Sequence, residues 1–465
     1  MLLRIFNVPV RLPILLLVVT EGVIFVLAAH LGAWISGGVL SGGFGQGAGT
    51  HPAAAAAFAT FSLVMLMAVG LYSTRQRCNT AGLAIRLATA VTGAVLLSAL
   101  VYYAVPGIAS SRGALLSSAV VAFTGVLALR LWTDRFPDNG LFKRRVLVFG
   151  AGSQAARILD LRRQADTRGF RIVAFVAAQG DEIAIPHERL VPRPPDLYWW
   201  AQENSIDDVV VAVSDRRRDF PMDELLECRL AGIDVLELPS FLERETARLW
   251  LDVMAPSWIV FGDGFRNSWL QGALKRAFDI IVCVVLLVAS VPALLVTVVA
   301  IWIEDGFRAP VLYRQRRIGL YNQPFDILKF RSMQENAEAD VAVWAERDDP
   351  RITKVGSFIR PMRIDEIPQL FNVLRGDMSF VGPRPERPEF VEQLAKAIPF
   401  YRARHAVKPG ITGWAQLCYP YGSSERDAKE KLQYDLYYIK NRNLFLDLAI
   451  VIQTVEVVLW QKGAR

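Results

Sequence analysis

Cysteine is scarce in this chain of 465 residues, and its spacing is uninformative for metals or disulfides. The four cysteines, Cys78, Cys228, Cys283 and Cys418, form no C-x-x-C pair. This excludes a disulfide framework and a cysteine zinc site, so we expect reduced thiols in the cytoplasm. No tyrosine has a lysine four positions later, and no Asp-x-Asp triplet occurs. These absences argue against a short-chain dehydratase and against a glycosyltransferase that holds its metal through Asp-x-Asp.

Acidic residues and lysine are nearly absent from the first 132 residues. This stretch contains seven arginines, no lysine and one acid, Glu21, so it carries six of the seven units of net positive charge. A basic chain can bind nucleic acid, but here the excess flanks apolar segments, so we expect no nucleic-acid partner. The hydrophobic fraction of 53% and the mean hydropathy of +0.29 exclude a disordered chain.

Four apolar segments near residues 12–35, 53–73, 83–105 and 114–132 are each about long enough for the ~20 residues that span a bilayer. No charged residue occurs between Glu21 and Arg75. The first segment is too long, and lacks the small-x-small site, for a cleavable signal peptide. The sequence therefore predicts a four-helix transmembrane bundle over residues 1–135, rather than core helices of a soluble protein.

The charged residues at the segment ends predict the orientation of this bundle. The loop at residues 36–50 has no charge, and the loop between the third and fourth segments has only Arg112. Because basic residues accumulate on the cytoplasmic side, both ends of the bundle should be cytoplasmic, in a bacterial inner membrane. The residues expected on that side are Arg4, Arg11, Arg75, Arg77, Arg86, Arg135, Lys143, Arg144 and Arg145.

Residues 143–265 have the pattern of a Rossmann-like α/β domain. An apolar strand at 146–149 is followed by Gly150-x-Gly152-x-x-Ala155, a turn that lets backbone N–H groups approach a phosphate. Further strands are expected at 171–176, 208–213 and 233–238. The acid that usually holds a ribose after the second strand is missing there, and the nearest one is Asp181. Catalytic dinucleotide use, regulatory nucleotide binding at Gly150, Gly152 and Ala155, and a purely structural role all stay open.

A second apolar region predicts a broken membrane helix over residues 272–306. Residues 280–303 are uncharged, but Pro292 interrupts the run and should kink it. Basic residues flank both ends, so the positive-inside bias places both ends on the cytoplasmic face. A re-entrant helix satisfies this bias, whereas a kinked spanning helix is the alternative. The flanking residues are Lys275, Arg276, Arg308, Arg314, Arg316 and Arg317.

The adjacent acids Asp365 and Glu366 are the chemical centre of the remaining segment. We expect them at the N-terminus of a helix with Pro368 in its first turn and Gly376 at its end. Its apolar face would contain Ile364, Ile367, Phe371 and Leu374. A helix N-terminus suits a carboxylate or a phosphate, and paired acids can divide nucleophilic attack from metal binding. Taken alone, the pair is more often an acidic first turn that complements the helix dipole.

Surrounding motifs change that interpretation. They are Lys275-Arg276-x-x-Asp279 before the broken helix, Lys329-Phe330-Arg331-Ser332-Met333, the Asp365-Glu366 pair, Gly382-Pro383-Arg384-Pro385 and the segment Lys408-Pro409-Gly410-Ile411-Thr412-Gly413-Trp414. In this order they resemble the bacterial polyprenyl-phosphate hexose-1-phosphate transferases, which initiate exopolysaccharide and glycoconjugate assembly. The whole chain resembles the large, multi-span members. One departure is Val291-Pro292, where the family commonly has Ser-Pro; Ser290 lies one place earlier.

The resemblance implies a mechanism and a set of site residues. Asp365 would attack the sugar-bearing phosphate of a UDP-sugar and release UMP, and undecaprenyl phosphate would then take the phosphosugar from the aspartyl intermediate. Asp365 and Glu366 would bind Mg²⁺. Substrate-binding roles are implied for Lys329, Arg331, Arg360, Arg384 and Asp435.

The resemblance also implies an α-rich cytoplasmic catalytic domain over residues 307–465. Its last segment, 443–460, would rest on the membrane surface or pack in the domain core. The rival interpretation is a non-catalytic membrane scaffold or sensor for polysaccharide export. The sequence leaves open which sugar is transferred and whether the protein is a monomer or a homodimer.

Overall fold

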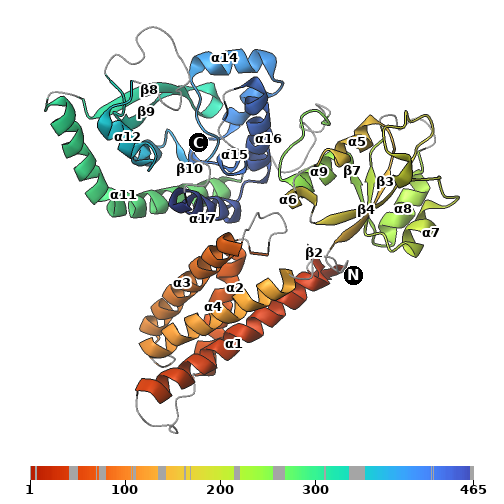
Figure 1. The fold of residues 1–465 in the computed structure, drawn as a ribbon, viewed down its shortest axis with the longest axis horizontal. Coiled ribbons are helices and arrows are strands. Elements are labelled where there is room, and N and C mark those ends of the chain that lie inside the picture. Colours follow the sequence, from red (N-terminus) through yellow and green to blue (C-terminus); the bar gives the residue numbers. More distant parts are fainter. Residues whose placement is uncertain are drawn as a thin grey trace. The chain divides into compact units, whose positions relative to one another are not determined.

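The computed structural model divides into two compact units, residues 1–241 and 242–465, which are shown in Figure 1. The structure describes residues 2–5, 8–40, 51–69, 71–72, 80–105, 107, 111–134, 143–161, 164–167, 169–213, 220–254, 268–307, 310–334, 351–419, 422 and 424–460. Cys78, most of the loop at 36–50, and the predicted domain boundary at 265 lie outside these residues.

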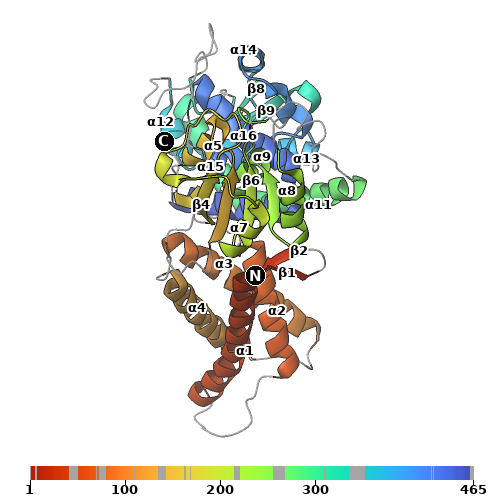
Figure 2. The ribbon, with the colours of Figure 1, turned by 90° about the vertical axis from the view of Figure 1, so that its right-hand side faces the viewer.

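The N-terminal helices form a bundle. It contains α1 (Leu12–Leu40), α2 (Pro52–Ala68), α3 (Thr80–Ala104) and α4 (Arg112–Asp134), preceded by a short antiparallel hairpin of β1 (Leu2–Ile5) and β2 (Val8–Arg11). Figure 2 shows α1 between α2 and α4, and α1 packs against both of these helices. Helices α1, α3 and α4 are long and apolar enough to cross a membrane, whereas α2 has only 17 residues. The bundle thus confirms the predicted apolar helices, with the second shorter than expected.

Two features bring α1 and α4 together. At Gly32, an added Cβ would lie only 2.4 Å from the backbone nitrogen of Ser118, so glycine is required for this close approach. Glu21 is completely buried, and Arg130 donates to it from Nε at 2.7 Å and from Nη2 at 3.1 Å. Arg130 also donates to the Leu71 carbonyl at 2.8 Å. The only acid of the first 132 residues is therefore neutralised inside the bundle.

The rest of the first unit confirms the predicted parallel α/β domain. Its five-stranded parallel sheet has the order β5-β4-β3-β6-β7, with β3 (Arg144–Phe149), β4 (Phe170–Val176), β5 (Leu190–Val191), β6 (Asp208–Val211) and β7 (Asp234–Glu237). The short strand β5 was not expected from the sequence. The connecting helices are α5 (Ser153–Leu159), α6 (Gln164–Thr167), a 3-10 turn η2 (His187–Arg189), α7 (Leu197–Glu203) and α8 (Met222–Leu230). Helix α9 (Leu238–Thr246) follows β7 and continues into the second unit. Leu147 and Phe149 of β3 pack with Leu197 of α7 and Leu225 of α8 in the core.

The second unit, which starts at Leu242, contains one long helix. Helix α11 (Trp269–Asp305) has 37 residues, starts at a capping box formed by Ser268 and Gln271, and contains Pro292. Figure 1 shows that it bends sharply into two segments. This confirms the predicted kink, because proline removes a helical hydrogen bond and clashes with the preceding turn.

The remaining elements of this unit are mainly helical, with two small sheets. Strands β8 (Leu312–Ile318) and β9 (Pro324–Phe330) form an antiparallel hairpin through the turn η3 (Leu320–Asn322), while β10 (Ser379–Val381) and β11 (Gly410–Thr412) are parallel. The helices are α12 (Lys354–Ile359), α13 (Gln369–Arg375), α14 (Pro388–Ala397), α15 (Trp414–Cys418), α16 (Glu425–Asn441) and α17 (Leu444–Trp460), with 3-10 turns η4 (Ile364–Glu366) and η5 (Tyr401–Ala406). Their core contains Val373, Met378, Val381, Leu432 and Leu436.

Both ends of α11 are attached to this unit. Near its start, Arg276 donates to the carbonyls of Val373 and Leu374 at 2.6 and 2.7 Å, so it caps the C-terminus of α13. At its end, Glu304 accepts hydrogen bonds from the backbone of α12, and Asp305 pairs with Arg331. The basic motif before the broken helix therefore has a structural role.

Asp279 adds a buried connection near the start of α11. It is 3% exposed and accepts hydrogen bonds from the hydroxyl of Ser379 at 2.8 Å and the backbone of Phe380 at 3.2 Å. Lys275 forms ion pairs of 3.0 Å with both Asp279 and Asp447, and the latter lies in α17. These contacts join α11, β10 and α17.

Candidate active site

The Asp365-Glu366 pair lies in the 3-10 turn η4, immediately before α13. Pro368 is the N-cap residue of α13, so it lies just before the first turn in which it was expected. Gly376 ends this helix with a φ of +100°, as the sequence predicted. The turn starts from Arg363, whose φ of +60° places it in the left-handed region. Both acids are 8% exposed, so the turn holds two adjacent carboxylates largely away from solvent.

One part of the helix prediction is wrong. Phe371 was expected on the buried face of α13, but it is 45% exposed, while Leu370 and Val373 are buried. The helix starts at Gln369, after the separate turn η4, so the periodicity counted from Ile364 does not continue into α13.

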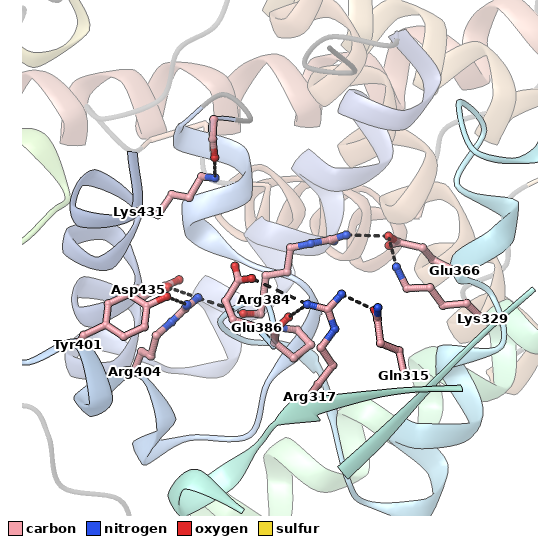
Figure 3. A network of polar contacts seen from close by, with 12 residues as sticks. Gln315, Arg317, Lys329, Glu366, Arg384, Glu386, Tyr401, Arg404, Lys431 and Asp435 are labelled. Carbon is pink, nitrogen blue, oxygen red and sulfur yellow. Dashed lines mark hydrogen bonds and ion pairs between the residues drawn. The ribbon is translucent and has the colours of Figure 1, made fainter. Parts of the chain in front are cut away.

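Glu366 is surrounded by cations. Its Oε1 atom lies 2.9 Å from Arg384, which donates a hydrogen bond, 3.5 Å from Lys329 and 3.6 Å from Arg363. Figure 3 shows Arg384 and Lys329 approaching it from different elements. Burial opposes ionisation, but these three cations outweigh it and hold the pKa of Glu366 well below its usual value. Glu366 is therefore a carboxylate throughout the physiological pH range.

Asp365 has a different environment. Among the residues that the structure describes, none forms a hydrogen bond or an ion pair with its carboxylate. Burial and the neighbouring charge of Glu366 raise the pKa of Asp365 to about 6, although Lys329, Arg360 and Arg363 oppose the shift. The two adjacent acids thus differ: one is fixed by cations, and the other is available for reaction.

Lys329 reaches the pair from β9, and the strand is held in place by Asn372 of α13. Asn372 is fully buried; its Oδ1 accepts a hydrogen bond from the Leu328 backbone at 2.9 Å, and its Nδ2 donates to the Asp326 carbonyl at 2.8 Å. These bonds join the open edge of β9 to the helix after the acids. Burial lowers the pKa of Lys329, whereas Glu366 opposes that change.

Arg384 reaches the pair from the segment between β10 and α14. Pro383, next to it, accepts a backbone hydrogen bond from Gly410 at 2.9 Å. The carbonyl of Arg384 itself accepts a bond of 3.0 Å from Arg404. Asp435, on α16, forms an ion pair of 2.8 Å with the same guanidinium and is only 2% exposed. Burial raises the pKa of Asp435 to about 6 against the opposing charge of Arg404.

The other predicted substrate-binding residues differ in position. Arg360 follows α12 and acts electrostatically on Asp365. Arg331 is buried and pairs with Asp305 at the end of α11, so the structure does not bring it to the carboxylates. Sequence reasoning did not identify Asn372 and Arg404. The signal for Asn372 was a polar residue within an apolar helix. Arg404 lies in the 3-10 turn η5, and no sequence motif marked it.

Among the described residues, the site offers a metal two carboxylates, those of Asp365 and Glu366. In the described part of the chain, no group of three or more His, Cys, Asp or Glu residues could hold a metal ion. Mg²⁺ commonly uses one or two carboxylates and fills its other positions with water and substrate phosphates. Arg384, Lys329 and Arg363 make their closest contacts with Oε1 of Glu366. The donor set therefore fits Mg²⁺ bound together with a phosphate substrate.

In the glycine turn of the α/β domain, a carboxylate of the protein itself binds a backbone N–H group of the turn. Oδ2 of Asp181 accepts hydrogen bonds from the backbone of Ala151 at 2.8 Å and of Ala178 at 3.1 Å. At Gly150, an added Cβ would lie 2.5 Å from the Ala212 carbonyl, so packing against the end of β6 explains this glycine. Nucleotide binding at Gly150, Gly152 and Ala155 stays a prediction that these contacts do not favour.

Comparisons with known proteins match both halves of the chain. Residues 270–461 match the bacterial sugar transferase family, and residues 67–219 match a family described as a CoA-binding domain. The chain is 43% identical over 336 residues to the UDP-glucose:undecaprenyl-phosphate glucose-1-phosphate transferase of Klebsiella pneumoniae, covering 70% of each protein. It is 31% identical to the protein of the same description from Xanthomonas campestris pv. campestris, over 72% of this chain and 71% of that relative.

A third relative has a different sugar in its description. The chain is 42% identical over 241 residues to the UDP-N-acetylgalactosamine-undecaprenyl-phosphate N-acetylgalactosaminephosphotransferase of Aeromonas hydrophila. This match covers 52% of the chain and 56% of that relative, which is less than two thirds of its length. Similarity alone therefore does not choose between glucose and N-acetylgalactosamine.

Proposed function

Because the chain belongs to the bacterial sugar transferase family, we infer that it transfers a hexose-1-phosphate from a UDP-sugar to undecaprenyl phosphate and releases UMP. The observation that carries this inference is the buried pair of acids with divided roles. Asp365 is without a hydrogen-bonding partner among the described residues, while Glu366 is fixed by Arg384, Lys329 and Arg363. Catalysis of phosphoryl transfer depends mainly on positioning the reacting groups and on neutralising the charge of the phosphates.

In the first half of the reaction, a carboxylate oxygen of Asp365 attacks the phosphorus that carries the sugar. The bond from this phosphorus to the oxygen bridging the two phosphates breaks, and UMP leaves with that oxygen. An aspartyl phosphosugar remains on the enzyme. Lys329, Arg360 and Arg384 offset the charge of the diphosphate, and the arginines can form two parallel hydrogen bonds with a phosphate.

In the second half, a phosphate oxygen of undecaprenyl phosphate attacks the same phosphorus. The bond between phosphorus and the Asp365 oxygen breaks, which regenerates the carboxylate and gives undecaprenyl diphosphate sugar. Asp365 and Glu366 would hold Mg²⁺, which supplies charge neutralisation at the phosphates. Because the acceptor is a membrane lipid, this transfer would start exopolysaccharide or glycoconjugate synthesis at the membrane.

The bent helix α11 supports a re-entrant placement. Its start is joined to α13 through Arg276 and its end to α12 through Glu304, so both ends contact the same unit. A helix that crossed the bilayer once would place its ends on opposite sides. We expect the second unit on the cytoplasmic face of the bacterial inner membrane, because UDP-sugars are present in the cytoplasm.

Labelling tests this placement. In a variant without reactive native cysteines, Ser268→Cys and Phe307→Cys mark the two ends of α11, and both positions are exposed. A membrane-impermeant thiol reagent should label both in inverted vesicles and neither in right-side-out vesicles. Labelling of the two positions from opposite sides would show a spanning helix.

The catalytic proposal is tested by UMP release. Purified protein with undecaprenyl phosphate, Mg²⁺ and a panel of UDP-sugars should release UMP with at least one sugar. Asp365→Asn should abolish this release while membrane expression stays normal. Glu392→Gln, which changes an exposed acid on α14, is the matched control and should keep the wild-type rate. Unchanged release by Asp365→Asn would favour the non-catalytic scaffold instead.

A further inference from the structure

Arg404 is a buried arginine outside the family motifs named above. It lies in the 3-10 turn η5 and is 6% exposed. Its Nη1 atom donates to the hydroxyl of Tyr401 at 2.7 Å, and its Nη2 atom donates to the carbonyl of Arg384 at 3.0 Å. In Figure 3, dashed lines mark the contacts of its guanidinium with Tyr401 and Asp435. A charge buried to this degree is costly unless it is paired and hydrogen-bonded, so these contacts define one orientation.

The contact with Arg384 connects this buried group to the reacting acids. Arg384 stands between two prolines, Pro383 and Pro385, which have no N–H groups to fix the segment by backbone donors. Instead, the carbonyls are held: that of Pro383 by the Gly410 backbone, and that of Arg384 by Arg404. The side chain of Arg384 then extends to Oε1 of Glu366 at 2.9 Å.

The carboxylate of Asp435 forms an ion pair with Arg404. The ion pair measures 2.8 Å, and both side chains are more than nine-tenths buried. Binding of a substrate by Oδ2 of Asp435 would require this pair to break and leave Arg404 buried without its ion-pair partner. Such a rearrangement is costly, because breaking one side of a buried pair leaves an uncompensated charge.

We propose that Arg404 is a positioning residue for sugar-phosphate transfer, acting through the carbonyl of Arg384, and that Asp435 holds Arg404 in place instead of binding substrate. This inference rests on the proposed function of the same site. Arg404 orients the segment 383–385 so that the Arg384 guanidinium meets Glu366. Lysine cannot replace it, because a single ammonium group cannot reproduce the planar fork that reaches Tyr401 and Arg384 through separate nitrogens.

The first experiment compares Arg404→Lys with Arg248→Lys in UMP release, per mole of folded enzyme from size-exclusion chromatography. Arg248 is the matched control: it is another mostly buried arginine of this unit, paired with Glu430 and stacked over Trp250. Arg404→Lys should lower kcat at least tenfold, whereas Arg248→Lys should stay within twofold of wild type. Equal losses in the two variants, or a wild-type rate in Arg404→Lys, would overturn the proposal.

The second experiment is a double-mutant cycle with Arg384→Gln. If Arg404 acts only through Arg384, the Arg404→Lys change should cost less than twofold in the Arg384→Gln background, because the guanidinium that it positions is gone. The same cost in both backgrounds would show an independent role. If Arg384→Gln removes all measurable turnover, the comparison with Arg248→Lys decides the question.

Asp435→Asn separates positioning from substrate binding. A positioning role predicts a lower kcat with the KM for the UDP-sugar within threefold of wild type, because the altered residue does not touch the substrate. A large increase of this KM with little change in kcat would return Asp435 to the substrate site. Failure of the proposed function would look different: wild-type protein would release no UMP with any UDP-sugar.

Discussion

The raised pKa of Asp365 should set an acid limit on the rate of UMP release. If Asp365 is the nucleophile, as we propose, only its carboxylate form can attack phosphorus. Burial together with the charge of Glu366 raises the pKa of Asp365 from 3.8 to about 6. The rate of the first half-reaction should therefore fall as the pH drops through about 6, instead of near 4. At pH 5, roughly a tenth of Asp365 would be ionised, whereas an ordinary aspartate would be almost fully ionised.

The assay is a rapid-quench measurement of UMP release between pH 4.5 and 8, at a limiting concentration of Mg²⁺. Limiting metal matters because protons and Mg²⁺ compete for the same carboxylates. Saturating Mg²⁺ should move the acid limit to lower pH, and the size of this movement reports metal binding at the pair. A rate at limiting Mg²⁺ that stays constant down to pH 5 would refute the reasoning.

Removing a positive charge near Asp365 should raise its pKa and move the acid limit of UMP release. Arg360 lowers the pKa of Asp365, so Arg360→Gln should move the acid limit to higher pH. Arg375→Gln is the control, because the side chain of Arg375 is 64% exposed and pairs with Asp377 at the far end of α13. A shift of equal size in both variants would point to a general effect of net charge.

Three further predictions concern the stability of each part of the chain. Glu21→Ala should leave Arg130 buried without its partner and destabilise the bundle by about 3–5 kcal/mol, seen as a lower melting temperature in detergent; an unchanged melting temperature would argue against this pair. Arg276→Ala removes two donors from the C-terminus of α13, and urea unfolding should show a loss of about 1–3 kcal/mol together with reduced UMP release. Asp181→Ala leaves the backbone N–H groups of Ala151 and Ala178 without this acceptor; proteolysis should then cut the α/β domain faster, while a wild-type rate of cleavage would show that the carboxylate contributes little.

Several features of the chain follow from local sequence patterns. Apolar runs of sufficient length predicted the helices of the bundle. The length and apolar composition of one segment are enough to favour a membrane helix, whatever other segment it packs against. Pro292 predicted the bend of α11, because the missing N–H and the steric clash are properties of the residue itself. The Gly-rich turn after an apolar strand predicted a parallel sheet, and the strands at 144–149, 170–176, 208–211 and 234–237 confirm it.

Contacts between distant segments could not be predicted in this way. Asp181 was noted as the nearest acid after the second strand, but its bonds with Ala151 and Ala178 depend on how the following loop folds back. The apolar spacing around Asp365 predicted that Phe371 lies on the buried face of a helix. The turn η4 is separate from α13, so the helical spacing counted from Ile364 does not apply to Phe371, which is exposed. A helix period is reliable only while the helix is continuous.

The sequence by itself determined the membrane helices, the parallel α/β domain and the identity of the paired acids, because each depends on residues close together in the chain. Tertiary structure alone decided how the two acids differ. Arg384, Lys329 and Arg363 converge on Glu366 from segments before and after it, whereas none forms a hydrogen bond or ion pair with Asp365 in the described residues. A carboxylate's charge state depends on which cations lie within a few ångströms, and only folding brings those cations there.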